Sequence, residues 1–282
     1  MRLPDFLVIG ALKAGTTYLD ELLRSHHEVC LPATLKELDY FGRNYERGPE
    51  WYERWFADCG SRRAGEVSPE YLGHPQAPAR IHGLLPDARL VACLRDPVER
   101  VYSEYKHYVQ RHGYDGEFEK FLGDYPDAIE KGRYFVLLSR YLELFAAEQL
   151  HVLIFEDLLR DPPRVMRDVF AFLRVDPDWV PPELEPVNVS VRPRFHRAYL
   201  TARAVSQWLH RRDSGDRVVA WAKRVGAPRL FGEARGEHFP PPSPGAIDRL
   251  SEAYADDVSS LSRLLDRDLS SLWPSIRASA RD

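Results

Sequence analysis

The chain has 282 residues, of which 44% are hydrophobic, a composition typical of a globular protein with a sizeable core. Its 39 basic and 43 acidic residues give a formal net charge of −4, which argues against a general binder of nucleic acid or of anionic membranes. The three cysteines are odd in number and lack CxxC spacing, so they suggest neither a disulfide framework nor a zinc site, and we expect a reducing cytoplasm.

The first predicted unit is a buried strand followed by a tight loop and a helix. Residues Phe6–Gly10 form a continuous apolar run of strand-forming residues that ends in glycine. A helical pattern follows from Thr16 to Arg24. Farther along the chain, Ala64–Pro69 is predicted as another strand and Ala77–Leu85 as a helix.

Further strands alternate with helices in the next part of the chain. The strand Ala88–Leu94 precedes Asp96 and Pro97, which signal a helix start because aspartate caps the helix and proline takes its first position. That helix is expected over Val98–His112. A helix, a strand and a second helix then follow over Tyr134–Ala147, Leu150–Phe155 and Pro163–Leu173. The alternation predicts an α/β fold with a parallel sheet covered on both faces.

Beyond about residue 177 the sequence becomes rich in proline and arginine. We interpret Phe239–Pro244 as a surface connector, because such a proline run can be neither a helix nor a central strand. Apolar residues between Ile247 and Leu265 recur every three or four positions, which predicts an amphipathic helix. We expect a single domain over residues 1–282, with a core of about 3–176 and a variable, mainly helical region of about 177–282.

The loop of residues 10–17, with the sequence GALKAGTT, lies between the first strand and its helix. In such a loop, backbone N–H groups and the positive end of the helix dipole attract an anion. Lys13 adds a positive charge, and Thr16 and Thr17 add hydroxyl donors. The loop is not a Walker A motif, because that motif places its lysine after the second glycine, whereas Lys13 precedes Gly15.

The KAGTT sequence after a buried strand resembles the 5′-phosphosulfate loop of sulfotransferases that use 3′-phosphoadenosine-5′-phosphosulfate (PAPS). The resemblance implies a P-loop-NTPase-like central parallel sheet with helices on both faces. It also implies a catalytic role for the lysine. The residues that it assigns to binding PAPS, and the product 3′-phosphoadenosine-5′-phosphate (PAP), are Lys13, Ala14, Gly15, Thr16 and Thr17.

The family's second signature is a strand followed by an arginine, a helix that starts with proline, and a serine, which together hold the 3′-phosphate. Arg95 follows a predicted strand, where ligands of open α/β sheets gather. Ser103 lies seven residues past Asp96, about two helical turns away. The resemblance therefore assigns Arg95 and Ser103 to the 3′-phosphate. The alternatives are a surface ion pair of Arg95 with Asp96 or Glu99, and a Ser103 that faces solvent.

A third segment is KELDYF at residues 36–41. It is followed by two tryptophans that each precede another aromatic residue, at Trp51-Tyr52 and Trp55-Phe56. It is similar to the KE-x-HFF and WY-x-x-F sequences of heparan-sulfate-type sulfotransferases, in which the glutamate is the proposed catalytic base. The resemblance gives Glu37 this role and places Lys36, Tyr40 and Phe41 against the substrate. Enclosure of Glu37 by these aromatic rings would disfavour its charged form and raise its pKa. The alternative is a solvated Lys36–Glu37 pair on a loop.

Three other segments match this branch less fully. Val67 stands where the branch commonly has a lysine. Tyr134 resembles the tyrosine of the family's G-x-Y sequence and is predicted to bind substrate, with a core position as the alternative. Arg235 and Gly236 resemble the loop that closes over the cofactor and are predicted to bind it, with a plain surface loop as the alternative.

Together these resemblances imply an enzyme that transfers a sulfuryl group from PAPS to a hydroxyl of a small-molecule acceptor, by in-line displacement and without a metal. Glu37 would remove the proton of the acceptor while Lys13 neutralises charge on the leaving group. A P-loop nucleotide kinase is the runner-up, although the GK[ST] lysine and a Walker B-like aspartate are missing. A non-catalytic relative that binds a nucleotide or a partner is the third interpretation.

The near-neutral charge favours a small acceptor over a long sulfated glycan. No apolar run approaches the roughly 18 residues of a membrane span. We therefore expect a bacterial, cytoplasmic enzyme of secondary metabolism, with neither nucleic acid nor membrane as a partner. The sequence does not distinguish a monomer from a homodimer.

Overall fold

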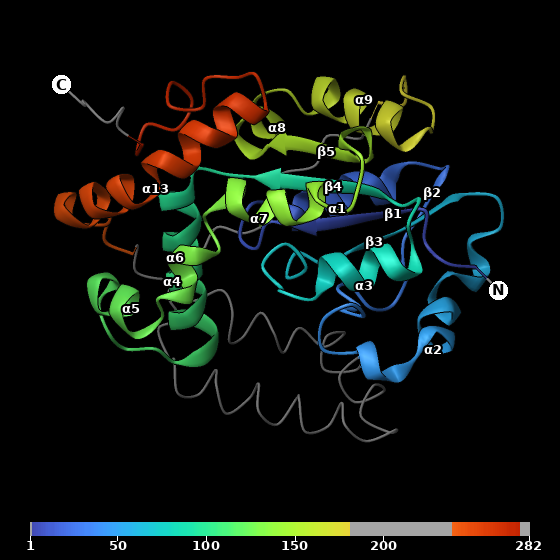
Figure 1. The fold of residues 1–282 in the computed structure, drawn as a ribbon, viewed down its shortest axis with the longest axis horizontal. Helices are drawn as coiled ribbons and strands as arrows, with labels where there is room; N and C mark the ends of the chain where they lie inside the picture. The colour runs from blue at the N-terminus through green and yellow to red at the C-terminus, as the bar shows by residue number, and fades with distance from the viewer. Residues whose placement is uncertain (1, 181–238, 277–282) are drawn as a thin grey trace, which may run out of the picture. The chain divides into compact units, whose positions relative to one another are not determined.

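A parallel sheet forms the centre of the computed structural model, which describes residues 2–180 and 239–276 (Figure 1). Within these residues the sheet has five strands in the order β2-β3-β1-β4-β5. Their bounds are β1 Phe6–Gly10, β2 Val29–Cys30, β3 Arg63–Val67, β4 Arg89–Leu94 and β5 Leu150–Ile154. The predicted α/β fold with a central parallel sheet is confirmed.

Strand β1 lies in the middle of the sheet and is paired on both sides. Its first residue, Phe6, is paired with Gly65 of β3 and with Arg89 of β4. All five residues of β1 are buried, since helices cover both faces of the sheet. This position explains why the strand is a continuous apolar run and not an alternating one.

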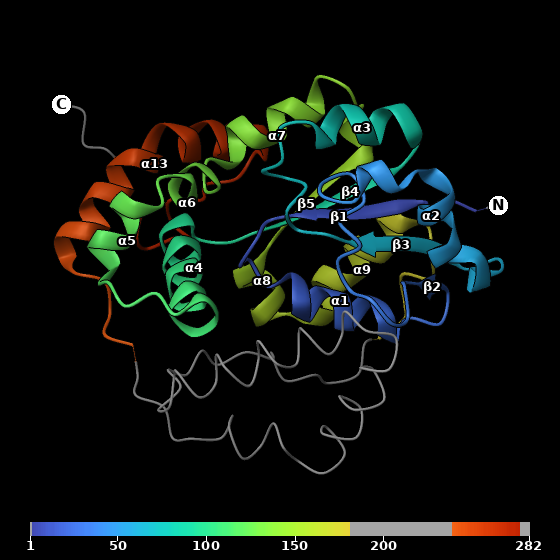
Figure 2. The ribbon, with the colours of Figure 1, turned by 90° about the horizontal axis from the view of Figure 1, so that it is seen from below.

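Helices cover the two faces of the sheet (Figure 2). On one face lie α1 (Thr16–Ser25), α8 (Phe155–Arg160) and α9 (Pro162–Leu173). On the other face lie α3 (Ala77–Leu84) and α7 (Tyr134–Leu142). The remaining described helices are α2 Pro49–Glu53, α4 Pro97–His112, α5 Phe118–Asp124, α6 Asp127–Glu130 and α13 Pro244–Leu264, with short 3₁₀ helices at η1 Tyr45–Arg47, η2 Arg54–Cys59 and η3 Ala147–Gln149.

The main hydrophobic core lies between the sheet and the first of these layers. Phe6 and Val8 of β1 and Cys93 of β4 point into it, because alternate residues of a strand face the same side. Leu22 of α1 and Phe170 of α9 meet them from the helices. Each such side chain stabilises the fold by about 1.5–3 kcal/mol when it is fully buried.

The structure differs from the sequence prediction at a few element ends. The helix predicted over Tyr134–Ala147 ends at Leu142, and the chain turns to enter β5. Gln149 fixes that turn by donating hydrogen bonds to the carbonyl oxygens of Pro86 and Ala88, at 2.9 and 3.2 Å. Strand β2 was not predicted, because two residues are too short for a periodic signal. The proline run gives no helix before Pro244, which takes the first position of α13.

Residue contacts divide the chain into two units. The first, with residues 1–101, 126–187 and 247–282, contains the sheet. The second comprises residues 102–125 and 188–246, and its described part is an aromatic cluster around Tyr105, Phe118 and Phe121. In this unit the Tyr102 hydroxyl donates a hydrogen bond to the carbonyl of Pro240. The predicted boundaries of the single domain and its core stay a prediction.

Candidate active site

The loop between β1 and α1 has the features of an anion site. Helix α1 begins at Thr16, and its N-cap, Gly15, provides no side-chain hydrogen bond to the exposed N–H groups of the first turn. Gly15 has φ 85°, and a Cβ there would lie 2.2 Å from the ring of Phe155, so glycine is required. Lys13 also adopts a left-handed conformation, with φ 65°. The N–H groups, the helix dipole and the lysine charge together favour a phosphate or sulfate group.

A hydrogen bond joins this loop to the segment that contains Glu37. Lys36 donates through Nζ to Oγ1 of Thr17, in the first turn of α1, at 2.8 Å. The same Nζ lies 3.6 Å from Oε1 of Glu37. The predicted residues Lys36 and Glu37 therefore lie next to the loop of residues 10–17, which we call the phosphate loop. The Glu37 side chain is 43% exposed and can meet a molecule that arrives from solvent.

The aromatic residues next to Glu37 do not enclose it. Tyr40 and Phe41, predicted to contact substrate, are buried and pack against Tyr52. The expected enclosure of Glu37 is therefore corrected. The physical reason is that Glu37, with φ 61°, turns its side chain outward while the next apolar side chains enter the core. The structure gives Tyr40 and Phe41 a packing role, and their contact with substrate stays a prediction.

The carboxylate that the aromatic residues do enclose belongs to Glu66 of β3. Tyr52 donates a hydrogen bond to its Oε2 at 2.5 Å, and Tyr71 donates to its Oε1 at 2.8 Å. The hydroxyl of Ser68 also donates to Oε1, and the backbone N–H of Asp39 does so at 3.1 Å. Burial raises the pKa of Glu66, and these four hydrogen bonds act in the opposite direction.

Glu66 is a structural residue that the sequence prediction missed. Its bond to the N–H of Asp39 fixes the segment after Glu37 against the end of β3. A signal was present, because a charged residue within a predicted buried strand requires hydrogen-bonding partners. The partners themselves lie far away in the sequence, and only the fold identifies Tyr52 and Tyr71.

Arg95 extends from the carboxyl end of β4, as predicted. Its guanidinium pairs with Glu99 at 3.1 Å and lies 5.4 Å from the ring centre of Phe155. The same Phe155 ring packs against Gly15, so it lies next to both the phosphate loop and Arg95. Tyr134 is buried and donates a hydrogen bond to the carbonyl of Arg95 at 2.9 Å. Burial raises the pKa of the Tyr134 phenol, which stays a donor and holds the strand end. Its contact with substrate stays a prediction.

A second group of polar residues, buried or partly buried, fixes the turn after Arg95. Asp96 accepts hydrogen bonds from the N–H groups of Val98 and Glu99, so it caps helix α4 as predicted. Glu156 accepts the N–H of Asp96 at 3.0 Å and the indole N–H of Trp273 at 3.1 Å. Burial raises the pKa of Glu156, while these hydrogen bonds and the charge of Arg95 lower it. No sequence pattern indicates this pairing of residues from distant segments.

Three predicted cofactor residues are not placed against this site. Ser103 lies on helix α4 in the part that belongs to the second unit, so its position relative to Arg95 stays a prediction. Arg235 and Gly236 lie outside the described residues.

The expectation that the cysteines form no disulfide was wrong. Cys30, at the end of β2, is bonded to Cys59, at the end of η2, and Cys93 is free and buried. The odd number of cysteines did not indicate a pair. The two bonded cysteines are separated by 29 positions, and only the folded sheet brings them together. The cysteine count therefore no longer supports a reducing compartment. The disulfide also fastens the chain directly before the segment that contains Glu37.

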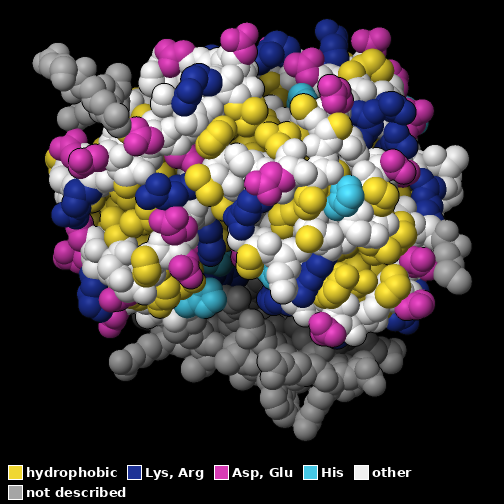
Figure 3. Space-filling model, viewed as in Figure 1, with side chains coloured by type: hydrophobic (Ala, Val, Ile, Leu, Met, Phe, Trp, Pro, Cys, Tyr) yellow, Lys and Arg dark blue, Asp and Glu magenta, His cyan; other side chains and the backbone are white. Residues whose placement is uncertain are grey.

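The charged side chains on the described surface are mixed in sign, as expected from the near-neutral composition. On the face shown in Figure 3, described Lys and Arg side chains are interspersed with Asp and Glu, without a continuous basic stripe. In residues 2–180 and 239–276, no helix combines the length and apolar character needed to cross a membrane. The same part of the chain contains no group of three or more His, Cys, Asp or Glu side chains placed to hold a metal ion.

Comparison with curated proteins finds relatives among much longer enzymes. Bifunctional heparan sulfate N-deacetylase/N-sulfotransferase 4 of Mus musculus is 29% identical to this chain over 94% of its length. The match covers 30% of that relative, so the chain spans less than a third of its length.

Solved structures and a family model give a consistent assignment. A sulfotransferase from Alicyclobacillus acidocaldarius is 27% identical, with a TM-score of 0.71 over 97% of this chain and 100% of that one. A mouse sulfotransferase in complex with PAP, 14% identical, has a TM-score of 0.51 over 94% of this chain and 88% of that one, and it supports the fold alone. The model of the sulfotransferase domain matches residues 3–188, which include all five strands and the phosphate loop. This chain therefore belongs to the sulfotransferase domain family.

Proposed function

We propose that this protein transfers the sulfuryl group of PAPS to a hydroxyl of a small-molecule acceptor, with Glu37 as the base. The observation that carries the proposal is the hydrogen bond from Lys36 to Thr17, 2.8 Å long. It joins an anion-binding loop to an exposed carboxylate. A transfer enzyme requires this juxtaposition, because the donor phosphate and the acceptor hydroxyl must be held side by side.

The residues present fit the anionic donor. The glycine at position 15 leaves room beside Phe155, and helix α1 has no side-chain cap to compete with an anion. Lys13 and the N–H groups of the loop would hold the 5′ end, with Ala14, Thr16 and Thr17 as its other contacts. Arg95 would hold the 3′-phosphate, together with the predicted Ser103, Arg235 and Gly236. PAPS, when bound, supplies the sulfuryl group that is transferred.

Two side chains have the main chemical roles in this proposal. Glu37 accepts the proton of the acceptor hydroxyl, which its exposure allows. Lys13 neutralises the negative charge that grows on the departing phosphate. Lys36 holds the two together, because one ammonium group contacts both Thr17 and Glu37.

The charge of the protein is the observation that concerns the identity of the acceptor. The net charge of −4 and the interspersed charges of Figure 3 support a small acceptor over a long sulfated glycan. Transfer to a hydroxyl, and a bacterial, cytoplasmic role in secondary metabolism, stay predictions. A panel of hydroxylated small molecules with labelled PAPS would identify the acceptor by transfer of the label.

Titration with PAP tests the donor site. We expect tight binding in the absence of Mg²⁺, and binding at least tenfold weaker in Lys13→Ala and Arg95→Ala, each of which loses a charged contact. Lys120→Ala, which removes an exposed lysine paired with Asp124, is the matched control and should bind normally. Absence of PAP binding would overturn the proposal, and binding that requires Mg²⁺ would favour the kinase interpretation.

Replacement of the base tests the mechanism. Glu37→Gln should lower kcat by about 10²–10⁴-fold, the usual contribution of a general base, without changing the Kd of PAP. Glu46→Gln, at an exposed position of η1, is the control and should retain full activity. Near-normal turnover in Glu37→Gln would remove this residue from the role of base.

A further inference from the structure

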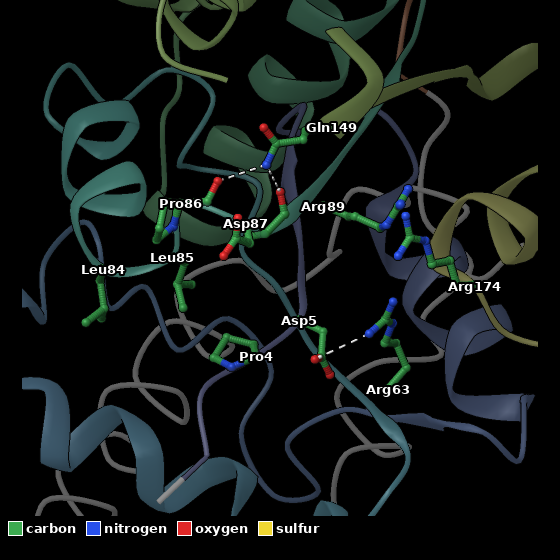
Figure 4. A pocket seen from close by; sticks show the side chains of 11 residues that line it. Pro4, Asp5, Arg63, Leu84, Leu85, Pro86, Asp87, Arg89, Gln149 and Arg174 are labelled. Carbon is green, nitrogen blue, oxygen red and sulfur yellow. Dashed lines mark hydrogen bonds and ion pairs between the residues drawn. The ribbon is translucent and has the colours of Figure 1, made fainter. Parts of the chain in front are cut away.

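A second concentration of cations lies at the amino edge of the sheet. Arg63 and Arg89 are the first residues of β3 and β4, and Arg174 is the C-cap of α9. All three line a hollow of about 540 Å³ (Figure 4). The phosphate loop lies at the carboxyl edge, roughly 16 Å away along a five-residue strand. The hollow is therefore separate from the candidate active site.

The positive charges of this hollow are incompletely neutralised by the described residues. Arg63 donates to the carbonyl of Leu173 at 2.8 Å and lies 3.5 Å from a carboxylate oxygen of Asp5. That carboxylate also pairs with Arg2, at 3.1 Å. Within the described part of the chain, neither Arg89 nor Arg174 has an ion pair, and Figure 4 shows their guanidinium groups side by side.

The three arginines lie close enough together to affect the pKa of Arg89. Burial lowers the pKa of Arg89, and the charges of Arg174 and Arg63 lower it further. Placing like charges together is unfavourable, and an anion between them would relieve the repulsion. Guanidinium groups suit this task, because each presents paired N–H donors to a sulfate, phosphate or carboxylate.

Apart from Asp87 and Gln149, which also line the hollow, the opposite wall is apolar. Pro4, Leu84 and Leu85 line it, across from the arginines in Figure 4. The volume lies within the range of small-molecule sites, about 300–1,000 Å³. One wall therefore suits an oxyanion and the other suits a hydrocarbon surface.

We propose that this hollow binds a small organic anion, whose sulfate, phosphate or carboxylate head meets Arg89 and Arg174 and whose apolar body lies against Leu84 and Leu85. The site is independent of the proposed transfer reaction, since it shares no residue with the carboxyl edge. Its ligand class differs from a bare inorganic ion because of the apolar wall.

Calorimetric titration with 2-naphthyl sulfate tests the proposal on the full chain. The titration is made with saturating PAP present, and again on Lys13→Ala without PAP, so that binding at the phosphate loop is excluded in two ways. The arginine variants described below distinguish the hollow from the acceptor position near Glu37. We expect one saturable site under both conditions. Inorganic sulfate should bind at least tenfold more weakly, and equal affinity for the two anions would overturn the organic-anion proposal.

Single substitutions test whether the anion binds to the arginines of the hollow. Arg174→Asn removes an exposed charge, and asparagine tolerates the left-handed conformation of this position, φ 59°. We expect at least tenfold weaker binding in Arg174→Asn and in Arg89→Gln. Arg167→Asn, an exposed position on the same helix α9, should bind normally. Affinity unchanged in Arg174→Asn, or no saturable site in the native chain, would overturn the proposal, and failure of PAP to bind would affect only the proposed function.

Discussion

The two edges of the sheet gather positive charge by different means. At the carboxyl edge, Lys13 and Arg95 each follow a strand and precede a helix, so their charges add to the positive ends of helix dipoles. At the amino edge, Arg63 and Arg89 start strands, and Arg174 ends a helix, where a cation offsets the negative end of the dipole. The carboxyl edge therefore combines its cations with the positive ends of helix dipoles, whereas the amino edge depends on its arginines alone.

The largest expected effect is on kcat/KM, which should depend on the carboxyl edge and not on the amino edge. Lys13→Ala should lower kcat/KM by about 10²–10³-fold, because one charged donor to the developing negative charge is lost. Arg174→Asn should leave kcat/KM unchanged, since it lies at the other edge. Steady-state kinetics of the two variants measure the contrast, and an equal loss in both would show that the edges are coupled.

The disulfide lies next to residues of both edges, because Cys30 is paired with Ala64, beside Arg63, and also precedes the segment that contains Glu37. Replacement of Cys30 and Cys59 by alanine should lower the free energy of unfolding by about 3–4 kcal/mol, the entropic effect expected for a loop of this length. The segment that contains Glu37 follows Cys30, so kcat should fall as well, and binding of 2-naphthyl sulfate should weaken too, because β2 pairs with Arg63 at the start of β3. Denaturant unfolding, kinetics and calorimetry of the double variant check these outcomes, and an unchanged free energy of unfolding would contradict the role given to the disulfide.

Two glutamates near the carboxyl edge should behave in opposite ways. Glu66→Gln should lower the free energy of unfolding by about 1–3 kcal/mol, because an amide cannot satisfy all the donors that now converge on the carboxylate. Glu37→Gln, at an exposed position, should leave that free energy within about 0.5 kcal/mol of the native value. Urea unfolding of both variants measures the difference. A stable Glu66→Gln chain would show that the tyrosine hydrogen bonds contribute little.

The smallest expected effect is a pH dependence of stability. The pKa of Glu66 is raised in the folded chain, so the folded state binds its proton more tightly than the unfolded state does. Its contribution to stability is present below the unfolded pKa, about 4.3, and is lost as the pH rises through the folded value. The stability difference between the native chain and Glu66→Gln should therefore decrease as the pH rises from the unfolded pKa through the folded one. A difference that grows with pH would contradict the burial argument.

Local signals in the sequence were sufficient for much of the fold. The strands β1, β4 and β5 and the helices α1, α4 and α9 lie within a residue or two of their predicted bounds. These elements are long, strongly apolar on the buried side, and marked by residues such as Asp96 at a helix start. The phosphate loop was predictable for the same reason, because its glycine, lysine and threonines are contiguous.

The resemblance to a sulfotransferase family was likewise available from contiguous motifs, and it is confirmed. The sequence by itself therefore determined the fold class, the family and the position of the phosphate loop. It could do so because backbone conformation, helix capping and anion binding by a loop depend on neighbours along the chain.

Only the tertiary structure decided which side chains meet across segments. It paired Cys30 with Cys59, buried Tyr134 against the backbone of Arg95, and enclosed Glu66 where the sequence suggested Glu37. It also gathered Arg63, Arg89 and Arg174 into one hollow. The physical reason is that parallel pairing sets the register between distant strands, so contacts at the two sheet edges depend on which strands are adjacent, and periodicity along a single segment does not encode that order.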